Sequence, residues 1–123
     1  MQRSIKFRAW NKTAREMWSW NDALSTMVGG TGQDLFSRDD LELMQYTNLK
    51  DKNDKEIYEG DIVGMPYNNY PQNWEVGELS EYGLQFHRIT NKPYSMGYHY
   101  RQLRHTELFE VIGNIYENPE LKP

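Results

Sequence analysis

Short segments in which apolar and polar residues alternate recur along the chain and predict β-strands. The first of them, residues 5–10, alternates apolar with mostly basic side chains. A repeat of two residues places successive side chains on opposite faces of a sheet, which is typical of a half-buried strand. The other predicted strands are residues 17–20, 43–47, 62–65, 74–79, 84–87 and 108–117.

Turn-forming residues separate these segments. Residues 11–13 predict the turn of a hairpin, and Asn53 with Asp54 predicts a tight type I′ reversal because both side chains tolerate left-handed backbone. Residues 59–61 predict a turn at the start of a strand, and Gly113 is a candidate β-bulge. Seven or eight short strands without a convincing long helix favour a small barrel or a sandwich.

The composition indicates a core built largely from rings. The chain has 123 residues, the size of one domain or of one domain with an appendage, and it carries 9 Tyr, 4 Trp and 4 Phe. Some of these rings are expected at an interface between protein chains, although an ordinary Tyr-covered surface is the open alternative. No apolar run approaches the roughly 18 residues of a membrane span, so we expect a soluble protein without a membrane partner.

Few catalytic or metal-binding chemistries fit the residues present. The absence of Cys excludes disulfides, thiolate nucleophiles and Cys-type zinc sites, and His87, His99 and His105 lack the spacing of a helical zinc motif. Residues 51–56 resemble a calcium loop, but Lys55 stands at a ligand position, so a hairpin turn is expected instead. We expect no catalytic residue, no metal and no cofactor.

Two acidic pairs keep an enzymatic alternative open. Asp39 with Asp40 and Glu59 with Asp61 are the clustered carboxylates that a metal-dependent nuclease would need. In residues 59–61, formation of a turn is the simpler role. A nuclease is therefore an alternative prediction that requires these acids to converge in space.

Charge is segregated along the chain, although the net charge is only −4. Residues 1–15 and residues 82–106 contain cations and no acid. Cations interleaved with rings are typical of single-stranded nucleic-acid binding, whereas a self-assembling chain can place its basic segments against the acidic ones of a neighbouring subunit. The candidate nucleic-acid-binding residues of the second segment are Arg88, Lys92, Tyr94, Tyr98, Tyr100, Arg101 and Arg104.

Residues 5–10, 43–63 and 109–121 together resemble the YopX family of phage and prophage proteins. The resemblance implies a mainly β fold with an SH3-like barrel, multimeric assembly and no assigned activity. It transfers no catalytic residue. The family usually has Gly after the residue equivalent to Asn53, where this chain has Asp54.

We therefore predict a mainly β protein with little helix. Residues 1–56 would form an N-terminal β hairpin or arm, and residues 57–123 a small SH3-like barrel, unless the two form one intertwined domain. The predicted function is that of a non-enzymatic phage or prophage accessory protein in the bacterial cytoplasm. It would assemble as a homo-oligomer and act as an interaction module, with nucleic acid or a phage or host protein as its partner.

Overall fold

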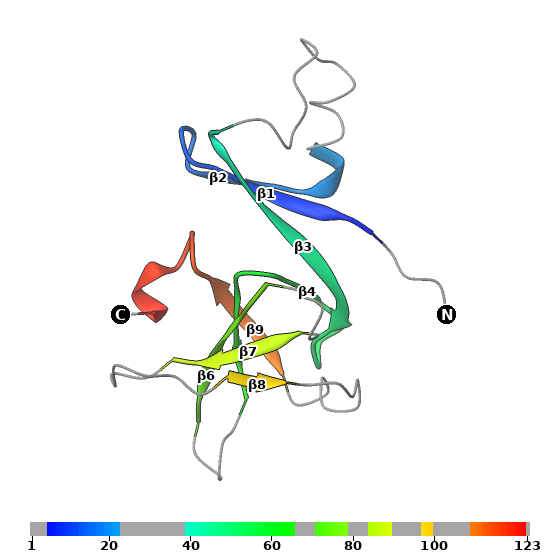
Figure 1. Ribbon diagram of the computed structural model, residues 1–123, viewed down its shortest axis with the longest axis vertical. Coiled ribbons are helices and arrows are strands. Elements are labelled where there is room, and N and C mark those ends of the chain that lie inside the picture. The colour runs from blue at the N-terminus through cyan, green and yellow to red at the C-terminus, as the bar shows by residue number, and fades with distance from the viewer. Residues whose placement is uncertain are drawn as a thin grey trace.

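The computed structural model describes residues 5–22, 39–65, 71–78, 84–89, 97–99 and 109–122, with only the backbone described at 97–99. These residues form two antiparallel sheets (Figure 1). In the four-stranded sheet the order is β2 (Glu16–Trp18), β1 (Phe7–Asn11), β3 (Leu41–Lys50) and β4 (Glu56–Tyr58). In the five-stranded sheet it is β8 (Gly97–His99), β7 (Gln85–Arg88), β6 (Asn73–Val76), β5 (Asp61–Gly64) and β9 (Glu110–Asn114).

Pro119–Leu121 forms a short 3-10 helix, η3, after β9. The strand content confirms the predicted mainly β fold with an N-terminal hairpin. No helix among the described residues is long and apolar enough to cross a membrane.

The β1–β2 hairpin is organised by Asn11, the last residue of β1. Its buried side-chain Oδ1 accepts hydrogen bonds from the N–H groups of Thr13 and Ala14, at 3.0 and 2.9 Å. Arg15 completes the turn with a positive φ of 55°. The predicted turn at residues 11–13 is thus confirmed, because an Asn side chain can bond to the backbone two and three residues ahead of it.

The reversal between β3 and β4 is confirmed, but the predicted type I′ turn is wrong. A type I′ turn centred on Asn53 and Asp54 needs positive φ at both residues, and only Asp54 has it, at 66°. The Asp54 N–H instead bonds to the Asp51 carbonyl at 3.0 Å, which places Lys52 and Asn53 at the centre of the turn. Asp54 then takes the left-handed position that follows.

The same turn closes the barrel. The Lys52 N–H donates to the Phe109 carbonyl at 2.9 Å, and the buried Asp51 carboxylate accepts the Val111 N–H at 2.9 Å, so the end of β3 is joined to β9. One core lies inside the curled five-stranded sheet and the ends of β3 and β4, as expected of a small SH3-like barrel. Its buried residues are Leu49, Ile57, Val63, Met65, Trp74, Val76, Leu84, Phe86 and Phe109.

The core therefore includes residues from both sides of the predicted boundary between residues 56 and 57. Leu49 at the end of β3 belongs to the same cluster as Ile57 and Trp74. In Figure 1, β3 runs from the β1–β2 hairpin down to the barrel and links the two parts. The division into 1–56 and 57–123 stays a prediction.

The predicted bulge at Gly113 is present in β9. Ile62 pairs with Gly113 and Val63 with Val111, so Ile112 is the extra residue opposite β5. A Cβ atom at Gly113 would lie 2.6 Å from Asn118 Oδ1 and 3.0 Å from Leu121 Cδ1. The missing side chain thus lets the turn after β9 fold back over this strand.

Candidate functional site

The two faces of β1 have different partners. Ala9 is buried in a small cluster with Leu41, against which Trp18, Trp20 and Leu43 pack. Because side chains alternate along a strand, Arg8 and Trp10 lie on the opposite face. Both contact residues of the five-stranded sheet or of the turn after it, as described below. We call this region, where β1 meets the start of β5 and residues 114–119, the joint.

A buried ion pair lies at the centre of the joint. Arg8 Nη2 is 2.6 Å from Asp61 Oδ1, and the two side chains are 14% and 1% exposed. The other carboxylate oxygen of Asp61 accepts the Tyr58 N–H at 2.8 Å, which fixes the turn at residues 59–61 as predicted. The Arg8 guanidinium also lies over the Tyr58 ring, 4.9 Å from its centroid.

Burial changes the pKa values of two side chains in this cluster, Asp61 and Tyr58. It raises the pKa of Asp61, while the charge of Arg8 and the Tyr58 N–H bond act in the opposite direction. Burial, together with the nearby Glu56 carboxylate, raises the pKa of the Tyr58 hydroxyl to about 12. Tyr58 therefore stays neutral at physiological pH, and the Arg8 cation is opposed by the Asp61 carboxylate.

A second contact of the joint is aromatic. The rings of Trp10 and Tyr116 stack with centroids 5.7 Å apart and planes inclined by 19°. Asn114 holds Tyr116 in place, because its Oδ1 accepts the N–H groups of Tyr116 and Glu117 at 3.0 and 2.8 Å. The Asn114 amide also donates to Glu117 Oε1 at 2.8 Å.

Two cavities adjoin these contacts. The larger one, of about 670 Å³, is called the aromatic cleft below, and it is lined by Trp10, Lys12, Arg15, Tyr116, Glu117 and Pro119. The smaller one, of about 450 Å³, lies beside the ion pair and includes Arg8, Lys55, Asp61 and Gly113. Glu117 lines both cavities.

Most of the residues predicted to bind nucleic acid lie outside the described part of the chain. Arg88 is the last residue of β7, and Tyr98 lies in β8, where its backbone pairs with Phe86. The undescribed residues of the set are Lys92, Tyr94, Tyr100, Arg101 and Arg104. Binding of single-stranded nucleic acid through residues 82–106 stays a prediction.

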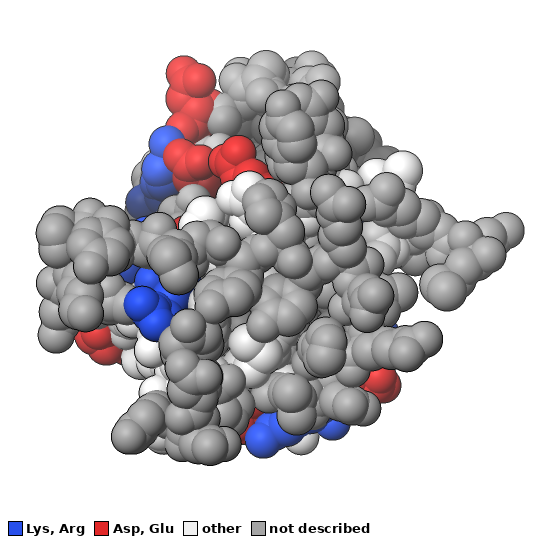
Figure 2. All heavy atoms as spheres, turned by 60° about the horizontal axis from the view of Figure 1, so that its bottom comes forward, with Lys and Arg blue, Asp and Glu red and all other residues white. Residues whose placement is uncertain are grey.

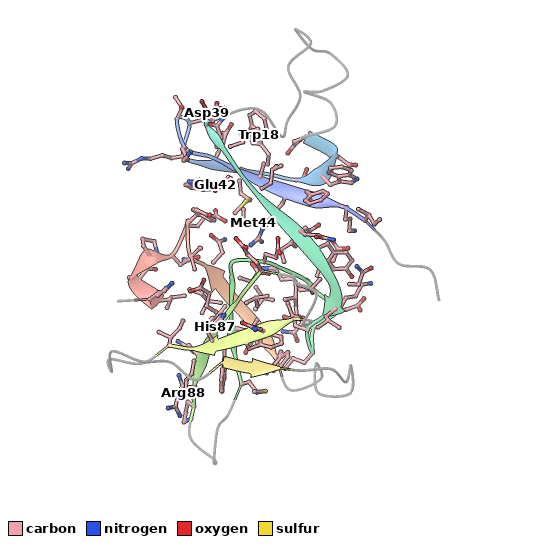
Figure 3. All side chains as sticks on the ribbon, viewed as in Figure 1. Trp18, Asp39, Glu42, Met44, His87 and Arg88 are labelled. Atoms are coloured by element: carbon pink, nitrogen blue, oxygen red, sulfur yellow. The ribbon has the colours of Figure 1, made fainter. Side chains whose placement is uncertain are left out.

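The two acidic pairs occupy different environments. Asp39 and Asp40 form a turn directly before β3, whereas Glu59 accepts the Gln45 N–H and Asp61 pairs with Arg8. Figure 3 shows Asp39 and Glu42 on the N-terminal sheet and His87 and Arg88 on the barrel. Within the described ranges, no three His, Asp or Glu side chains gather in a way that could hold a metal ion.

Three of the described cations near the N-terminus pair with carboxylates within the chain. Lys6 pairs with Glu56, Arg8 with Asp61, and Lys12 with Glu42 at 3.3 Å. Figure 2 shows basic and acidic side chains side by side at the upper left of the described surface. The segregation of charge along the sequence is thus partly neutralised by folding.

No pattern in the sequence points to the aromatic cleft. Alternation in residues 5–10 does place Arg8 and Trp10 on one face, but it does not show that this face meets residues about a hundred positions away. Lys12 and Arg15 were recognised only as members of a basic segment. Their proximity to Tyr116 follows from the tertiary fold alone.

These features define a two-sheet, mainly β protein with a small barrel and a polar, aromatic joint. The family model described as "YopX protein" matches residues 6–121, and the chain belongs to the YopX family. The structure is similar to the crystal structure of protein EF1440 from Enterococcus faecalis, with a TM-score of 0.57 and 25% sequence identity. That likeness covers 99% of this chain and 100% of the other. A search of curated proteins found no relative of this chain.

Proposed function

We propose that this YopX-family protein is a non-enzymatic phage or prophage accessory protein that self-assembles in the bacterial cytoplasm and acts as an interaction module. The non-enzymatic part of this proposal is supported by the contacts of Glu59 and Asp61, two of the carboxylates that a nuclease would need. Asp61 neutralises Arg8 and caps the Tyr58 N–H, while Glu59 holds the Gln45 N–H. Carboxylates held in such contacts stabilise the fold.

The observation that carries self-assembly is an exposed apolar side chain on β9. Ile112 is 39% exposed and is the bulged residue of β9, the outermost strand of the five-stranded sheet, whose residues 109 and 111 bond to the turn at residues 51–52. An exposed apolar side chain loses contact with water when a second copy covers it, which favours association. Ile5, which is 71% exposed before β1, is a second apolar position of this kind.

Sedimentation velocity on the full chain tests this proposal. The parent is expected to be an oligomer at micromolar concentration, and Ile112→Lys is expected to shift it toward the monomer. Asn53→Lys adds the same charge at an exposed turn position and serves as the matched control. Because Lys6, Arg8 and Lys12 already have partners within the chain, added salt should weaken the oligomer little. A monomeric parent would overturn the proposal.

A further inference from the structure

The aromatic cleft is built by segments from the two ends of the chain. Trp10, Lys12 and Arg15 come from the β1–β2 hairpin, and Tyr116, Glu117 and Pro119 come from the turn after β9 and the start of η3. Figure 1 shows the β1–β2 turn and the C-terminal segment on the same side of the molecule. The cleft is therefore present only when the N-terminal hairpin is docked on the barrel.

The rings supply a platform for a further planar group. Trp10 and Tyr116 stack on each other, are both half-buried and both line the cleft. The Asn114 bonds to the backbone of residues 116 and 117 fix the platform before any ligand arrives. Such fixed aromatic surfaces stack nucleobases independently of their sequence, because every base has a π face.

Two cations, Lys12 and Arg15, lie beside the platform and differ in how readily they can bind an anion. Lys12 is about half exposed, and its 3.3 Å pair with Glu42 is equally exposed, so this bond is weak and exchangeable. Arg15 is exposed, and among the described carboxylates none pairs with its guanidinium. A guanidinium binds phosphate oxygens through two parallel N–H groups, which makes Arg15 the stronger phosphate ligand of the two.

Glu117 adds an acceptor at the same cleft. Its Oε1 already accepts the Asn114 amide, and this bond orients the carboxylate. A carboxylate accepts hydrogen bonds and donates none, so it favours a base edge that presents N–H groups. Guanine presents two such groups next to each other, which matches the two oxygens of a carboxylate.

We propose that the aromatic cleft binds a nucleotide unit, either free or within a single strand. The base stacks on the Trp10–Tyr116 platform, Arg15 and Lys12 hold the phosphate, and Glu117 accepts N–H groups of the base, with guanine preferred. The ligand thus enters at the joint, between the β1–β2 hairpin and residues 116–119. This inference names a ligand for the proposed interaction module. It rests on the proposed function only in assuming that the site binds its ligand and does not catalyse a reaction.

Titration of the full chain with GMP, guanosine, inorganic phosphate and a short G-containing single-stranded oligonucleotide tests the inference. Tryptophan fluorescence and calorimetry serve as readouts. GMP is expected to bind at least about tenfold more tightly than guanosine or phosphate alone, because guanosine lacks the phosphate and inorganic phosphate lacks the stacking base. If the oligonucleotide binds more tightly than GMP, the ligand is a nucleotide within a single strand. If GMP binds more tightly than the oligonucleotide, the ligand is a free nucleotide.

Variants separate the cleft from general charge attraction. Arg15→Asn removes the cation and keeps a residue that tolerates the positive φ of this position, and Glu117→Gln removes the carboxylate charge. Arg15→Asn should weaken GMP binding by about tenfold, and Glu117→Gln should abolish the preference for GMP over AMP. Lys50→Gln is the matched control, because Lys50 is a half-exposed cation that does not line the cleft.

Three results would overturn the inference. They are no saturable binding of GMP or oligonucleotide at low salt, equal weakening by Arg15→Asn and Lys50→Gln, and binding of inorganic phosphate as tight as that of GMP. The oligomeric state of the same samples keeps the two proposals distinct. An oligomer that binds no nucleotide overturns the cleft and leaves self-assembly standing, and a monomer that binds nucleotide does the reverse.

Discussion

Arg8 on β1 and Asp61 at the start of β5 form a buried ion pair, 2.6 Å between Nη2 and Oδ1, that ties the N-terminal hairpin to the barrel. The pair joins segments that would otherwise be linked mainly through the long strand β3. Asp61 is the more deeply buried partner, at 1% exposed. Its charge therefore depends on Arg8 more than the charge of Arg8 depends on it.

The first prediction is that replacing Arg8 destabilises the fold. Arg8→Met leaves a buried carboxylate without its cation, and we expect a loss of about 3–5 kcal/mol in the free energy of unfolding. Adding Asp61→Asn to Arg8→Met should recover part of that loss, because the uncompensated charge is gone. Urea denaturation of the two variants measures both effects. A loss below about 1 kcal/mol for Arg8→Met would show that the pair contributes only what a surface pair does.

The second prediction concerns pH and Asp51. Burial raises the pKa of this carboxyl, but the N–H groups of Val111, Lys55 and Asn53 outweigh burial and hold the pKa below the ordinary value of 3.8. A lowered pKa in the folded state means that the ionised carboxyl stabilises the fold above pH 3.8. That stabilisation is lost as the pH falls through the folded pKa.

Urea denaturation as a function of pH checks this sign. Asp51→Asn should be less stable than the parent at neutral pH, and the difference should shrink as the pH is lowered beneath 3.8. Asp61 acts in the opposite direction, because its pKa is raised and protonation therefore favours the folded state as the pH falls. A gap between parent and Asp51→Asn that stays constant across this range would contradict the assigned role of Asp51.

The third prediction uses the left-handed residue of the β3–β4 turn. Asp54 has a φ of 66°, a conformation that Gly adopts without steric cost. Asp54→Gly should therefore raise the free energy of unfolding by up to about 1 kcal/mol, measured by thermal or urea denaturation. The exposed Lys50–Asp54 pair, at 3.7 Å, is lost in this variant, and Lys50→Gln measures that loss separately. A destabilised Asp54→Gly would show that the turn depends on the carboxylate.

The fourth prediction tests the close contact at the β9 bulge. Gly113→Ala should destabilise the fold by about 1–3 kcal/mol, because the new Cβ would lie 2.6 Å from Asn118 Oδ1. Gly64→Ala on the neighbouring strand β5 is the matched control, since its Cβ would meet no atom closer than 3.8 Å. Equal thermal stability of the two variants would mean that the turn after β9 moves aside freely.

Most of the strands could be predicted from the sequence because their signal is local, whereas β4 and β8 lie in segments for which no strand is predicted. Alternation in residues 5–10 depends on side chains that are neighbours in the chain, and the bulge in β9 lies next to a glycine that is visible in the sequence. The type of the β3–β4 turn was predicted wrongly because the buried Asp51 carboxylate, which bonds to Val111 60 residues away, favours a different turn. The same carboxylate bonds within the turn, to the N–H groups of Asn53 and Lys55, and across the barrel to Val111.

The sequence alone could not predict the candidate site, because only the tertiary fold brings its residues together. Trp10 and Tyr116 are unremarkable members of two predicted strands until the fold stacks them. The sequence directed attention to residues 82–106 because charge and rings alternate there without an acid. At the N-terminus Lys6, Arg8 and Lys12 pair with carboxylates within the chain, which composition cannot reveal.

The central structural claim is that the hairpin and the barrel form one cooperative unit, since the aromatic cleft exists only at their joint. Native-state hydrogen exchange of the full chain, followed by NMR, tests this claim most directly. The slowest amides of the β1–β3 pair and of the β5–β6 pair should exchange with the same free energy of opening, equal to that of global unfolding. If the β1–β3 amides open at a clearly lower free energy while the β5–β6 amides stay protected, the hairpin detaches independently and the claim is contradicted.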